Sequence, residues 1–325
     1  QISSIEHYIS DIYLDKVIME HEPPKGQNVA VIGSGPAGIA VSVKLAQRGY
    51  DVTIFERKSK LGGMMRYGIP SFRLPLSILD RYQKKLVELG IHIRPNTTIG
   101  SVITLDTLFR DGYDAIFIGS GVWRPRGLGV KGESLGCCHY AVDYLQNPDV
   151  YDLGDRVAII GSGNQLDAAR TAIRKGSRYV TVYARRNEVR ASIREYEYAQ
   201  ADGVEFEFNK GVDSITREGP MFKERHFDEE GHLIGEDEAK LFPADSTIIA
   251  VSQGPKDKIV RTTTGLEVNE RGLVEVDENG ATTREGVFSA GDVVLGPCNV
   301  VEVVKDAKHV AKSIDEYLTK KRETK

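Results

Sequence analysis

The chain has 325 residues and carries 43 Lys and Arg against 47 Asp and Glu, which gives a formal net charge of −4 at pH 7. Its length is sufficient for two domains of ordinary size, and its content of 40% hydrophobic and 28% charged residues is typical of a globular protein. The mildly acidic charge, with no apolar run of about 18 residues and no signal-peptide pattern, predicts a cytoplasmic protein that binds no nucleic acid and does not insert into membranes.

The first predicted element is a short amphipathic helix. Within residues 4–17 the apolar residues recur at helical spacing, at Ile5, Tyr8, Ile9, Ile12 and Tyr13. The sequence Glu-Pro-Pro-Lys-Gly at residues 22–26 then ends the regular structure. We treat residues 1–25 as an N-terminal helical segment. The sequence begins with Gln1 rather than Met, which leaves open that further sequence precedes it.

Residues 28–56 follow the order of a dinucleotide-binding unit. The small and β-branched residues 29–32 predict a strand that is buried on both faces, and residues 51–55 predict a second one. Between them, the turn Gly33-Ser-Gly35-Pro-Ala-Gly38 allows a tight bend, a close backbone approach to a pyrophosphate and close packing of helix against strand. The helix offers N–H groups to the phosphates, and Glu56 offers an acceptor to a ribose diol.

Two features favour FAD as the dinucleotide at this turn. Gly62 and Gly63 follow Glu56 closely, and Pro36-Ala37 separates the glycines of the turn. Both features resemble the extended FAD fingerprint of flavoproteins that bind two dinucleotides.

Further along the chain, residues 76–89 predict an amphipathic helix, and residues 91–94 and 113–118 predict strands. Near the end, the strand-like residues 286–290 lead into Gly291-Asp292. In the same flavoproteins this dipeptide reaches the ribityl and pyrophosphate part of FAD. Alone it would be an ordinary turn, but together with the first unit it favours flavin.

A second unit of the same order occupies residues 156–186. A buried strand leads into Gly161-Ser-Gly-Asn-Gln165, a helix follows, and a second strand ends in Arg185-Arg186. Two guanidinium groups at the position that Glu56 holds in the first unit favour the 2′-phosphate of NADP over the 2′-hydroxyl of NAD. The alternative is a pair of exposed loop arginines, and Glu188 nearby would weaken the preference.

Leu166 departs from the fingerprint of this second unit. It stands where the third small residue belongs, and we expect it to push the helix away from the strand or to redirect the first helical turn. The departure leaves open that the second unit no longer binds a nicotinamide nucleotide.

Together the elements predict an α/β protein with two dinucleotide-binding, Rossmann-like domains. The NAD(P)-binding domain, residues 137–284, is expected as an insertion in a discontinuous FAD-binding domain made of residues 26–136 and 285–325. Two dinucleotides in one chain suggest hydride transfer between them. That step requires alignment and exclusion of water rather than a side-chain acid or base, so we predict no catalytic residue.

The stretch Met65-Arg-Tyr-Gly-Ile-Pro-Ser-Phe-Arg-Leu-Pro75 resembles the Tyr-Gly-Ile-Pro-x-Phe-Arg-Leu-Pro sequence of the glutamate synthase small-subunit family. The same flavoprotein module occurs in dihydropyrimidine dehydrogenase and in electron-bifurcating ferredoxin:NADP transhydrogenases. Further matches at residues 96–100, 123–126, 167–172 and 291–302 extend the resemblance over nearly the whole chain. The resemblance implies a subunit that passes electrons from NAD(P)H, with NADPH favoured, through FAD to iron–sulfur centres.

The resemblance also implies which residues contact each cofactor. For FAD they are Gly33, Ser34, Gly35, Pro36, Ala37, Gly38, Glu56, Arg57, Gly63, Ile99, Gly121, Gly291, Asp292, Val300 and Val301. For NAD(P) we expect Gly161, Ser162, Gly163, Asn164, Gln165, Arg185, Arg186 and Gln253. The start of the last helix, near Val300, would stabilise negative charge on the reduced flavin. Arg73 is a candidate for tuning the flavin, with a structural ion pair as the alternative.

Iron–sulfur clusters are expected outside this chain. Cys137, Cys138 and Cys298 have no metal-ligand spacing and cannot supply the four ligands of a cluster. The clusters would lie on a partner subunit or in an upstream region, within a larger redox complex in which bifurcation and the terminal acceptor stay open. The alternative is an FAD-holding relay or scaffold subunit without nicotinamide binding. A thioredoxin-reductase-like activity is disfavoured because it needs a Cys-x-x-Cys pair, and no metal site is predicted.

Overall fold

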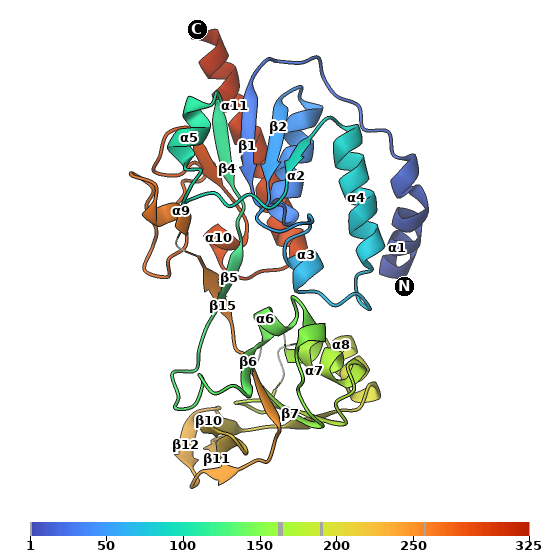
Figure 1. Cartoon of the computed structure of the whole chain (residues 1–325), viewed down its shortest axis with the longest axis vertical. Coiled ribbons are helices and arrows are strands. Elements are labelled where there is room, and N and C mark those ends of the chain that lie inside the picture. Colours follow the sequence, from blue (N-terminus) through green and yellow to red (C-terminus); the bar gives the residue numbers. More distant parts are fainter. Residues whose placement is uncertain (1, 162–164, 189–190, 257, 325) are drawn as a thin grey trace. The chain divides into compact units, whose positions relative to one another are not determined.

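Figure 1 shows the computed structural model of the chain, which describes residues 2–161, 165–188, 191–256 and 258–324. The chain divides into two compact units. Unit 1 comprises Gln1–Arg66, Ser71–Val122 and Gly254–Lys325, and unit 2 comprises Tyr67–Pro70 and Trp123–Gln253. Each unit contains a parallel sheet with helices packed on it, which confirms the predicted α/β fold class. Among the described helices, none is long and apolar enough to cross a membrane.

The chain returns to unit 1 earlier than the sequence predicted. The return falls at Gly254, whereas we expected it at residue 285. The reason is packing, because Leu266 and Val274 are buried in the same core cluster as the strand residue Ile116 of unit 1. The segment that contains these two residues therefore packs on one face of the sheet of unit 1.

Two short strands mark the positions where the chain passes between the units. They are β5 (Val122–Pro125), on the way out of unit 1, and β15 (Gln253–Pro255), on the way back. The two strands pair as a two-stranded sheet. The entry and exit of the inserted segment are therefore neighbours.

The sheet of unit 1 has the strand order β16-β4-β1-β2-β3, and all its pairings are parallel. The strands are β1 (Asn28–Ile32), β2 (Asp51–Phe55), β3 (His92–Arg94), β4 (Ala115–Ile118) and β16 (Val287–Ser289). The residues of β1 and β4 are small or apolar and almost completely buried, as expected for strands covered on both faces. The strand that precedes the first glycine turn therefore lies at the centre of the sheet.

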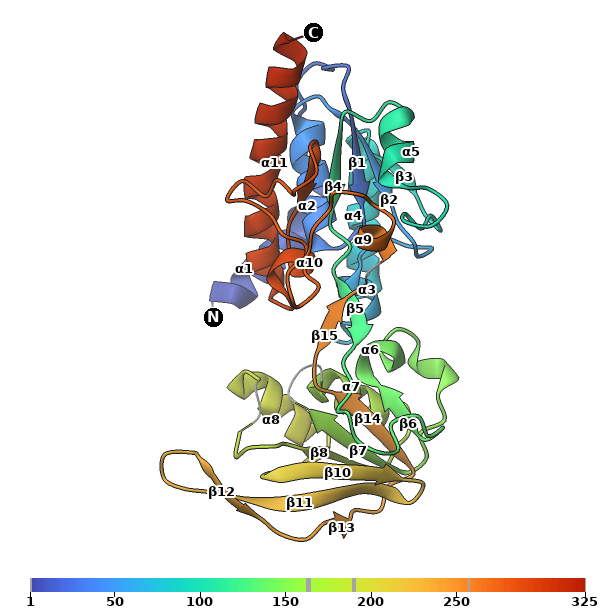
Figure 2. The ribbon, with the colours of Figure 1, turned by 90° about the vertical axis from the view of Figure 1, so that its left-hand side faces the viewer.

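Helices cover one face of this sheet, as Figure 2 shows for α2 and α11. They are α2 (Pro36–Gln47), α4 (Leu76–Glu88) and α11 (Val300–Glu323). Their buried side chains, among them Val41, Leu86 and Val310, share one core with the strands. The other face is covered by α5 (Leu105–Arg110) and by residues 266–294. The short helices α3 (Met64–Tyr67), α9 (Lys258–Arg261) and α10 (Asp292–Leu295) lie in the connections.

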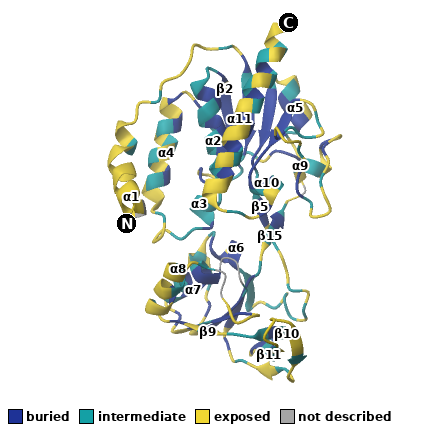
Figure 3. Ribbon diagram, turned by 180° about the vertical axis from the view of Figure 1, so that it is seen from behind, coloured by how far each residue is buried: buried dark blue, intermediate teal, exposed yellow. Residues whose placement is uncertain are grey.

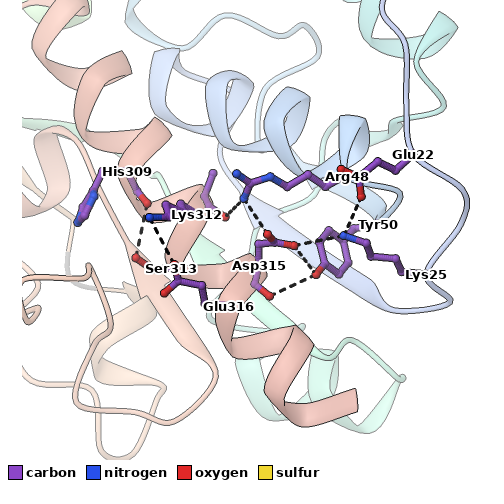
Figure 4. Close-up of polar contacts among 10 residues, drawn as sticks. Glu22, Lys25, Arg48, Tyr50, His309, Lys312, Ser313, Asp315 and Glu316 are labelled. Atoms are coloured by element: carbon purple, nitrogen blue, oxygen red, sulfur yellow. Dashed lines mark hydrogen bonds and ion pairs between the residues drawn. The ribbon is translucent and has the colours of Figure 1, made fainter. Parts of the chain in front are cut away.

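A polar network around Asp315 fixes the C-terminal part of α11 (Figure 4). Asp315 accepts a hydrogen bond of 2.7 Å from the Tyr50 hydroxyl and forms ion pairs with Lys25 at 3.3 Å and Arg48 at 3.1 Å. Burial, together with the hydrogen bond to Asp315, raises the pKa of Tyr50 to about 12. The network joins α11 to the loop between α2 and β2.

The N-terminal segment forms α1 (Ile2–Tyr13), followed by the 3₁₀ turn η1 (Leu14–Lys16). Its apolar side chains are exposed, with Ile2 at 76% and Tyr8 at 68%, and the helix is coloured as exposed in Figure 3. Arg81 of α4 donates two hydrogen bonds of 3.1 Å to the Asp15 carboxylate and one of 2.7 Å to the Asp11 carbonyl. Polar contacts therefore contribute to holding this segment on unit 1.

Unit 2 contains a parallel sheet with the order β6-β14-β7-β8-β9. Its strands are β6 (Cys138–Tyr140), β7 (Arg156–Gly161), β8 (Tyr179–Tyr183), β9 (Val204–Glu207) and β14 (Ser246–Ala250). The helical elements are α6 (Ala141–Tyr144), η2 (Pro148–Val150), α7 (Gln165–Arg174) and α8 (Ile193–Ala201). The small residues Ala168, Ala169 and Ala172 are completely buried, so α7 packs closely on the sheet.

A second, antiparallel sheet extends unit 2. It consists of β10 (Lys210–Thr216), β11 (Gly219–Phe227), β12 (Leu233–Glu236) and β13 (Lys240–Leu241). An aromatic cluster joins it to the parallel sheet, because Tyr183 of β8 stacks on Phe222 of β11 with ring centroids 4.3 Å apart. Phe242 contacts both rings edge-on. This sheet lies on the parallel sheet at the end of β8.

Candidate dinucleotide sites

The first glycine turn of unit 1 links β1 to α2. Gly33 has a φ of +96°, and a Cβ atom there would lie 2.6 Å from the Gly119 carbonyl oxygen. A Cβ atom on Gly38 would lie 2.0 Å from the Gly33 carbonyl oxygen, so the helix packs on the turn with no room for a side chain. By contrast, a Cβ atom on Gly35 would meet nothing within 4 Å. The turn therefore has no room for side chains at Gly33 and Gly38, whereas the space next to Gly35 is open.

The N-terminus of α2 lies at this open position. Gly35 is the N-cap residue and provides no side-chain cap, and Pro36 occupies the first turn of the helix. The first backbone N–H groups of a helix and the positive end of its dipole attract phosphate. The arrangement therefore fits a pyrophosphate group at Gly35, Pro36 and Ala37.

Glu56 is anchored directly after β2. Its side chain is 5% exposed, and its carboxylate accepts hydrogen bonds from Ser34 N at 3.0 Å, Ser34 Oγ at 2.5 Å and Lys58 N at 2.8 Å. These contacts hold the carboxylate beside the glycine turn. A carboxylate in this position can accept a hydrogen bond from a ribose hydroxyl of a bound dinucleotide.

The second glycine pair packs directly on the first turn. Gly63 has a φ of +52°, and a Cβ atom there would lie 2.7 Å from the Cα atom of Gly35. Gly62 has a φ of +125°, and its N–H group donates to the Ser34 carbonyl oxygen at 3.1 Å. Only glycine suits such positions, because of both the backbone angle and the close contact. The structure thus brings together two glycine motifs that are separated by about 25 residues of sequence.

The Gly291-Asp292 turn reaches the same place from the other end of the chain. Gly291 has a φ of +77°, and a Cβ atom there would lie 3.1 Å from the Cβ atom of Ala37. Its N–H group donates to Asp306 Oδ2 of α11 at 2.8 Å. The turn after β16 is therefore held between α2 and α11.

Asp292 and Cys298 brace the loop that leads into α11. Oδ1 of Asp292 accepts hydrogen bonds from Cys298 N at 3.3 Å and from the Cys298 thiol at 3.2 Å. Burial raises the pKa of the Asp292 carboxyl, and the two contacts with Cys298 oppose that shift. Burial and the neighbouring Asp292 raise the pKa of the Cys298 thiol to about 12, so the thiol is a hydrogen-bond donor at neutral pH. Sequence reasoning missed both Cys298 and Asp306.

The N-terminus of α11 is exposed next to this loop. The Asn299 side chain caps the helix by accepting a hydrogen bond of 2.9 Å from Glu302 N. Val300 is 40% exposed and Val301 is 78% exposed, so two apolar side chains face solvent at the first turn.

The remaining residues expected at FAD lie elsewhere in the same unit. Ile99 is buried in the core with Leu105, and Gly121 follows β4 with a φ of +66°. Arg57 is half-buried beside Glu56, and Arg73 is exposed in the segment before α4. The contacts described above join the three glycine turns and Glu56, and none of them involves these four residues.

The second unit places its glycine turn at the end of β7. Gly161 has a φ of +148°, and a Cβ atom there would lie 2.3 Å from the Ala250 carbonyl oxygen. Ser162, Gly163 and Asn164 lie outside the described residues. Gln165 begins α7 and is completely buried, and its carboxamide has no hydrogen-bond partner in the described part of the chain. Leu166, which we expected to disturb the helix, is 7% exposed and belongs to the core of unit 2.

Arg185 and Arg186 are exposed and follow β8 after Ala184. β8 lies next to β7, just as β2 lies next to β1 in unit 1. Phe55 pairs with Ile32, and Tyr183 pairs with Ile160, so Ala184 stands at the position of Glu56 and the two arginines follow directly after it. Gln253 is half-buried in β15. The positive charge of Arg185 and Arg186 suits a phosphorylated ribose.

A parallel sheet, a glycine turn and a helix occur in that order in both units. This arrangement defines the class of α/β proteins with two dinucleotide-binding folds. A family model described as pyridine nucleotide-disulphide oxidoreductase matches residues 27–313. The chain belongs to this oxidoreductase family, so the predicted class of enzyme is confirmed.

Relatives and solved structures agree with the family. The beta subunit of NADP(+)-dependent formate dehydrogenase from Moorella thermoacetica is 36% identical over 314 residues, covering 90% of this chain and 44% of that protein. A glutamate synthase [NADPH] small chain from Halomonas elongata is 31% identical, covering 98% of this chain and 74% of its own length. The structure of FprA from Mycobacterium tuberculosis in complex with NADPH has a TM-score of 0.76 at 18% identity and covers 93% of this chain and 86% of its own.

These matches confirm the predicted kinship with glutamate synthase small chains. The chain spans less than half of the formate dehydrogenase subunit, at 44% of its length. The family supports FAD and NAD(P)H as the class of cofactors, and the relatives are named as subunits of larger enzymes.

Proposed function

We propose that this chain is an FAD-dependent NAD(P)H oxidoreductase subunit that passes electrons from NAD(P)H through FAD to iron–sulfur centres on a partner subunit or in an upstream region. The observation that carries the proposal is the convergence of three glycine turns, at residues 33–38, 62–63 and 291, beside the buried carboxylate of Glu56. Such an arrangement can bind a pyrophosphate that approaches the backbone closely, together with a ribose.

The residues of unit 1 fit this group in chemistry and in shape. FAD bound there supplies an acceptor for hydride that can release its two electrons one at a time. The turn at Gly35 and the N-terminus of α2 would bind the pyrophosphate, and Glu56 would bind a ribose hydroxyl. The N-terminus of α11 at Val300 would stabilise negative charge and cover an apolar ring.

Unit 2 binds the nicotinamide nucleotide in this proposal, with NADPH favoured. The support is the exposed pair Arg185 and Arg186 after β8, where two guanidinium groups can bind a 2′-phosphate. A preference for NADPH is also supported by the comparisons, because FprA was solved in complex with NADPH and two relatives have NADP(+) or NADPH in their names. Their names as subunits support a place in a larger complex.

An anaerobic titration tests the proposal. Purified protein should carry a yellow chromophore or take it up from added FAD, and NADPH should bleach its absorbance at a lower concentration than NADH. The proposal is wrong if intact protein remains colourless after incubation with FAD. Mass spectrometry of proteins that co-purify with the chain would identify the electron-accepting subunit.

A second candidate function is an FAD-holding relay or scaffold that binds no nicotinamide nucleotide. Gln165 and Leu166 favour it, because both are buried at the start of α7, where a small residue would leave space for a pyrophosphate. In the same titration, this candidate predicts FAD that dithionite reduces but that neither NADPH nor NADH bleaches. Equilibrium dialysis with NADPH would then show no binding.

A further inference from the structure

Ser34 makes contacts on two sides of the first glycine turn. Its side chain is completely buried, with an exposure of 0%. The hydroxyl donates to Glu56 Oε2 at 2.5 Å and accepts from Gly62 N at 3.3 Å. The backbone of Ser34 forms hydrogen bonds with the same two residues: its N–H group donates to the Glu56 carboxylate, and its carbonyl oxygen accepts from Gly62 N. Ser34 therefore joins the acid after β2 to the second glycine pair.

Among the described residues, the hydrogen bonds of Glu56 leave one acceptor position of its carboxylate unused. An ionised carboxylate offers about four lone-pair positions. Ser34 N, Ser34 Oγ and Lys58 N occupy three of them. The carboxylate is thus almost saturated by the protein and is held in one orientation. The remaining position suits one hydroxyl group of a ribose.

We propose that Ser34 is a positioning residue for ribose recognition: its hydroxyl orients Glu56 and ties that carboxylate to the Gly62-Gly63 turn, so that the adenosine half of the dinucleotide meets a preformed acceptor. The inference rests on the proposed FAD site. It assigns to Ser34 an action through Glu56 rather than a direct contact alone.

The expected effect of removing the hydroxyl follows from the contacts that remain. In Ser34→Ala, the Gly62 N–H group can still donate to the carbonyl oxygen of residue 34. The Glu56 carboxylate can still accept hydrogen bonds from two backbone N–H groups. The fold should therefore persist, but the carboxylate loses its shortest hydrogen bond. Hydrogen bonds to charged groups are worth about 1.5–3 kcal/mol, which corresponds to a loss of about 10- to 150-fold in affinity for a ligand that needs the oriented carboxylate.

The chain offers a matched control in Ser42 on α2. Its side chain is also completely buried, and its hydroxyl has no hydrogen-bond partner among the described residues. Ser42→Ala removes a buried hydroxyl of the same unit without removing a contact to Glu56. The comparison of the two variants separates the role of Ser34 from a general effect of replacing buried serine.

The experiment measures binding to the full chain after removal of any bound flavin. Isothermal calorimetry with FAD, ADP and 2′,3′-dideoxy-ADP is carried out on the wild type, Ser34→Ala, Ser34→Cys and Ser42→Ala. We expect Ser34→Ala to lose about 10-fold or more in affinity for FAD and ADP. Binding of dideoxy-ADP, which has no ribose hydroxyl to offer, should not change. Ser34→Cys, with its weaker donor, should be intermediate, and Ser42→Ala should match the wild type.

The outcomes separate this inference from the proposed function. Wild-type protein that binds neither FAD nor ADP contradicts the proposed function itself. If the wild type binds FAD but Ser34→Ala equals Ser42→Ala, or weakens dideoxy-ADP as much as ADP, Ser34 is not a positioning residue. A double-mutant cycle adds a second criterion, because Ser34→Ala should have no further effect in a Glu56→Ala background, in which the acceptor of the Ser34 hydroxyl is absent. Additive losses in that cycle would overturn the inference.

Discussion

Replacing Gly35 by alanine should separate ligand binding from folding. Gly35 has a φ of −70° and a ψ of −174°, which alanine adopts without strain, and a Cβ atom there meets nothing within 4 Å. The free energy of unfolding of the ligand-free chain should therefore stay within about 1 kcal/mol of the wild type. The new methyl group occupies the space through which phosphate would approach the turn. Crowding of this kind costs about 1–3 kcal/mol, so FAD affinity should fall about 5- to 150-fold.

The assay combines urea denaturation of the ligand-free protein with titration of FAD, followed by the quenching of flavin fluorescence. Gly38→Ala serves as the contrasting variant, because its Cβ atom would lie 2.0 Å from the Gly33 carbonyl oxygen and must disturb the turn itself. We expect Gly38→Ala to lose stability and binding together, whereas Gly35→Ala loses binding alone. Wild-type FAD affinity in a folded Gly35→Ala protein would refute the placement of the pyrophosphate at this turn.

Three further predictions concern stability. Asp315→Ala should lower the free energy of unfolding by about 2 kcal/mol, because the Tyr50 hydroxyl and two cations lose their shared acceptor; chemical denaturation measures this. Tyr144→Phe should raise the free energy of unfolding by about 1 kcal/mol, because the Tyr144 hydroxyl is completely buried and has no hydrogen-bond partner among the described residues. A lower melting temperature of this variant would contradict the prediction. The hydrogen bond from Arg174 lowers the pKa of Asp202 below 3.8, so the stabilisation by Asp202 is present above pH 3.8 and is lost as the pH falls further. Asp202→Asn should therefore be less stable than the wild type at pH 7, and the difference in denaturation midpoint should shrink below pH 4.

The glycine turn and its flanking strands could be predicted because their determinants are local. The predicted strand at residues 29–32 lies within β1, which begins one residue earlier, and the predicted strand at residues 51–55 coincides with β2. The sequence pattern also singled out Gly62-Gly63 by residue type, and the structure gives a reason for glycine there, since only glycine permits a backbone contact as close as that between Gly63 and Gly35. Residue type and spacing carry this information without any knowledge of tertiary contacts.

The parts that could not be predicted depend on long-range packing. Asp306 binds the Gly291 N–H group only because α11 runs past the end of β16, and nothing in the sequence near Asp306 indicates that contact. The return of the chain at Gly254 follows from the burial of Leu266 and Val274 on the sheet of unit 1. Leu166 departs from the fingerprint in the sequence pattern, and the structure buries it among apolar side chains of unit 2. In the first two cases the contacts join segments that are not adjacent along the chain.

The pairing of β5 with β15 has a consequence for how the polypeptide folds while it is being synthesised on the ribosome. The longer segment of unit 2, Trp123–Gln253, is continuous, and its two ends meet at these strands, so nearly all of it is available once residue 255 has emerged. Unit 1 must wait, because its edge strand β16 and its covering helix α11 are translated after unit 2. We expect the inserted part to fold first, whereas unit 1 keeps apolar surface uncovered until α11 has emerged and thus has the greater need of chaperones during translation.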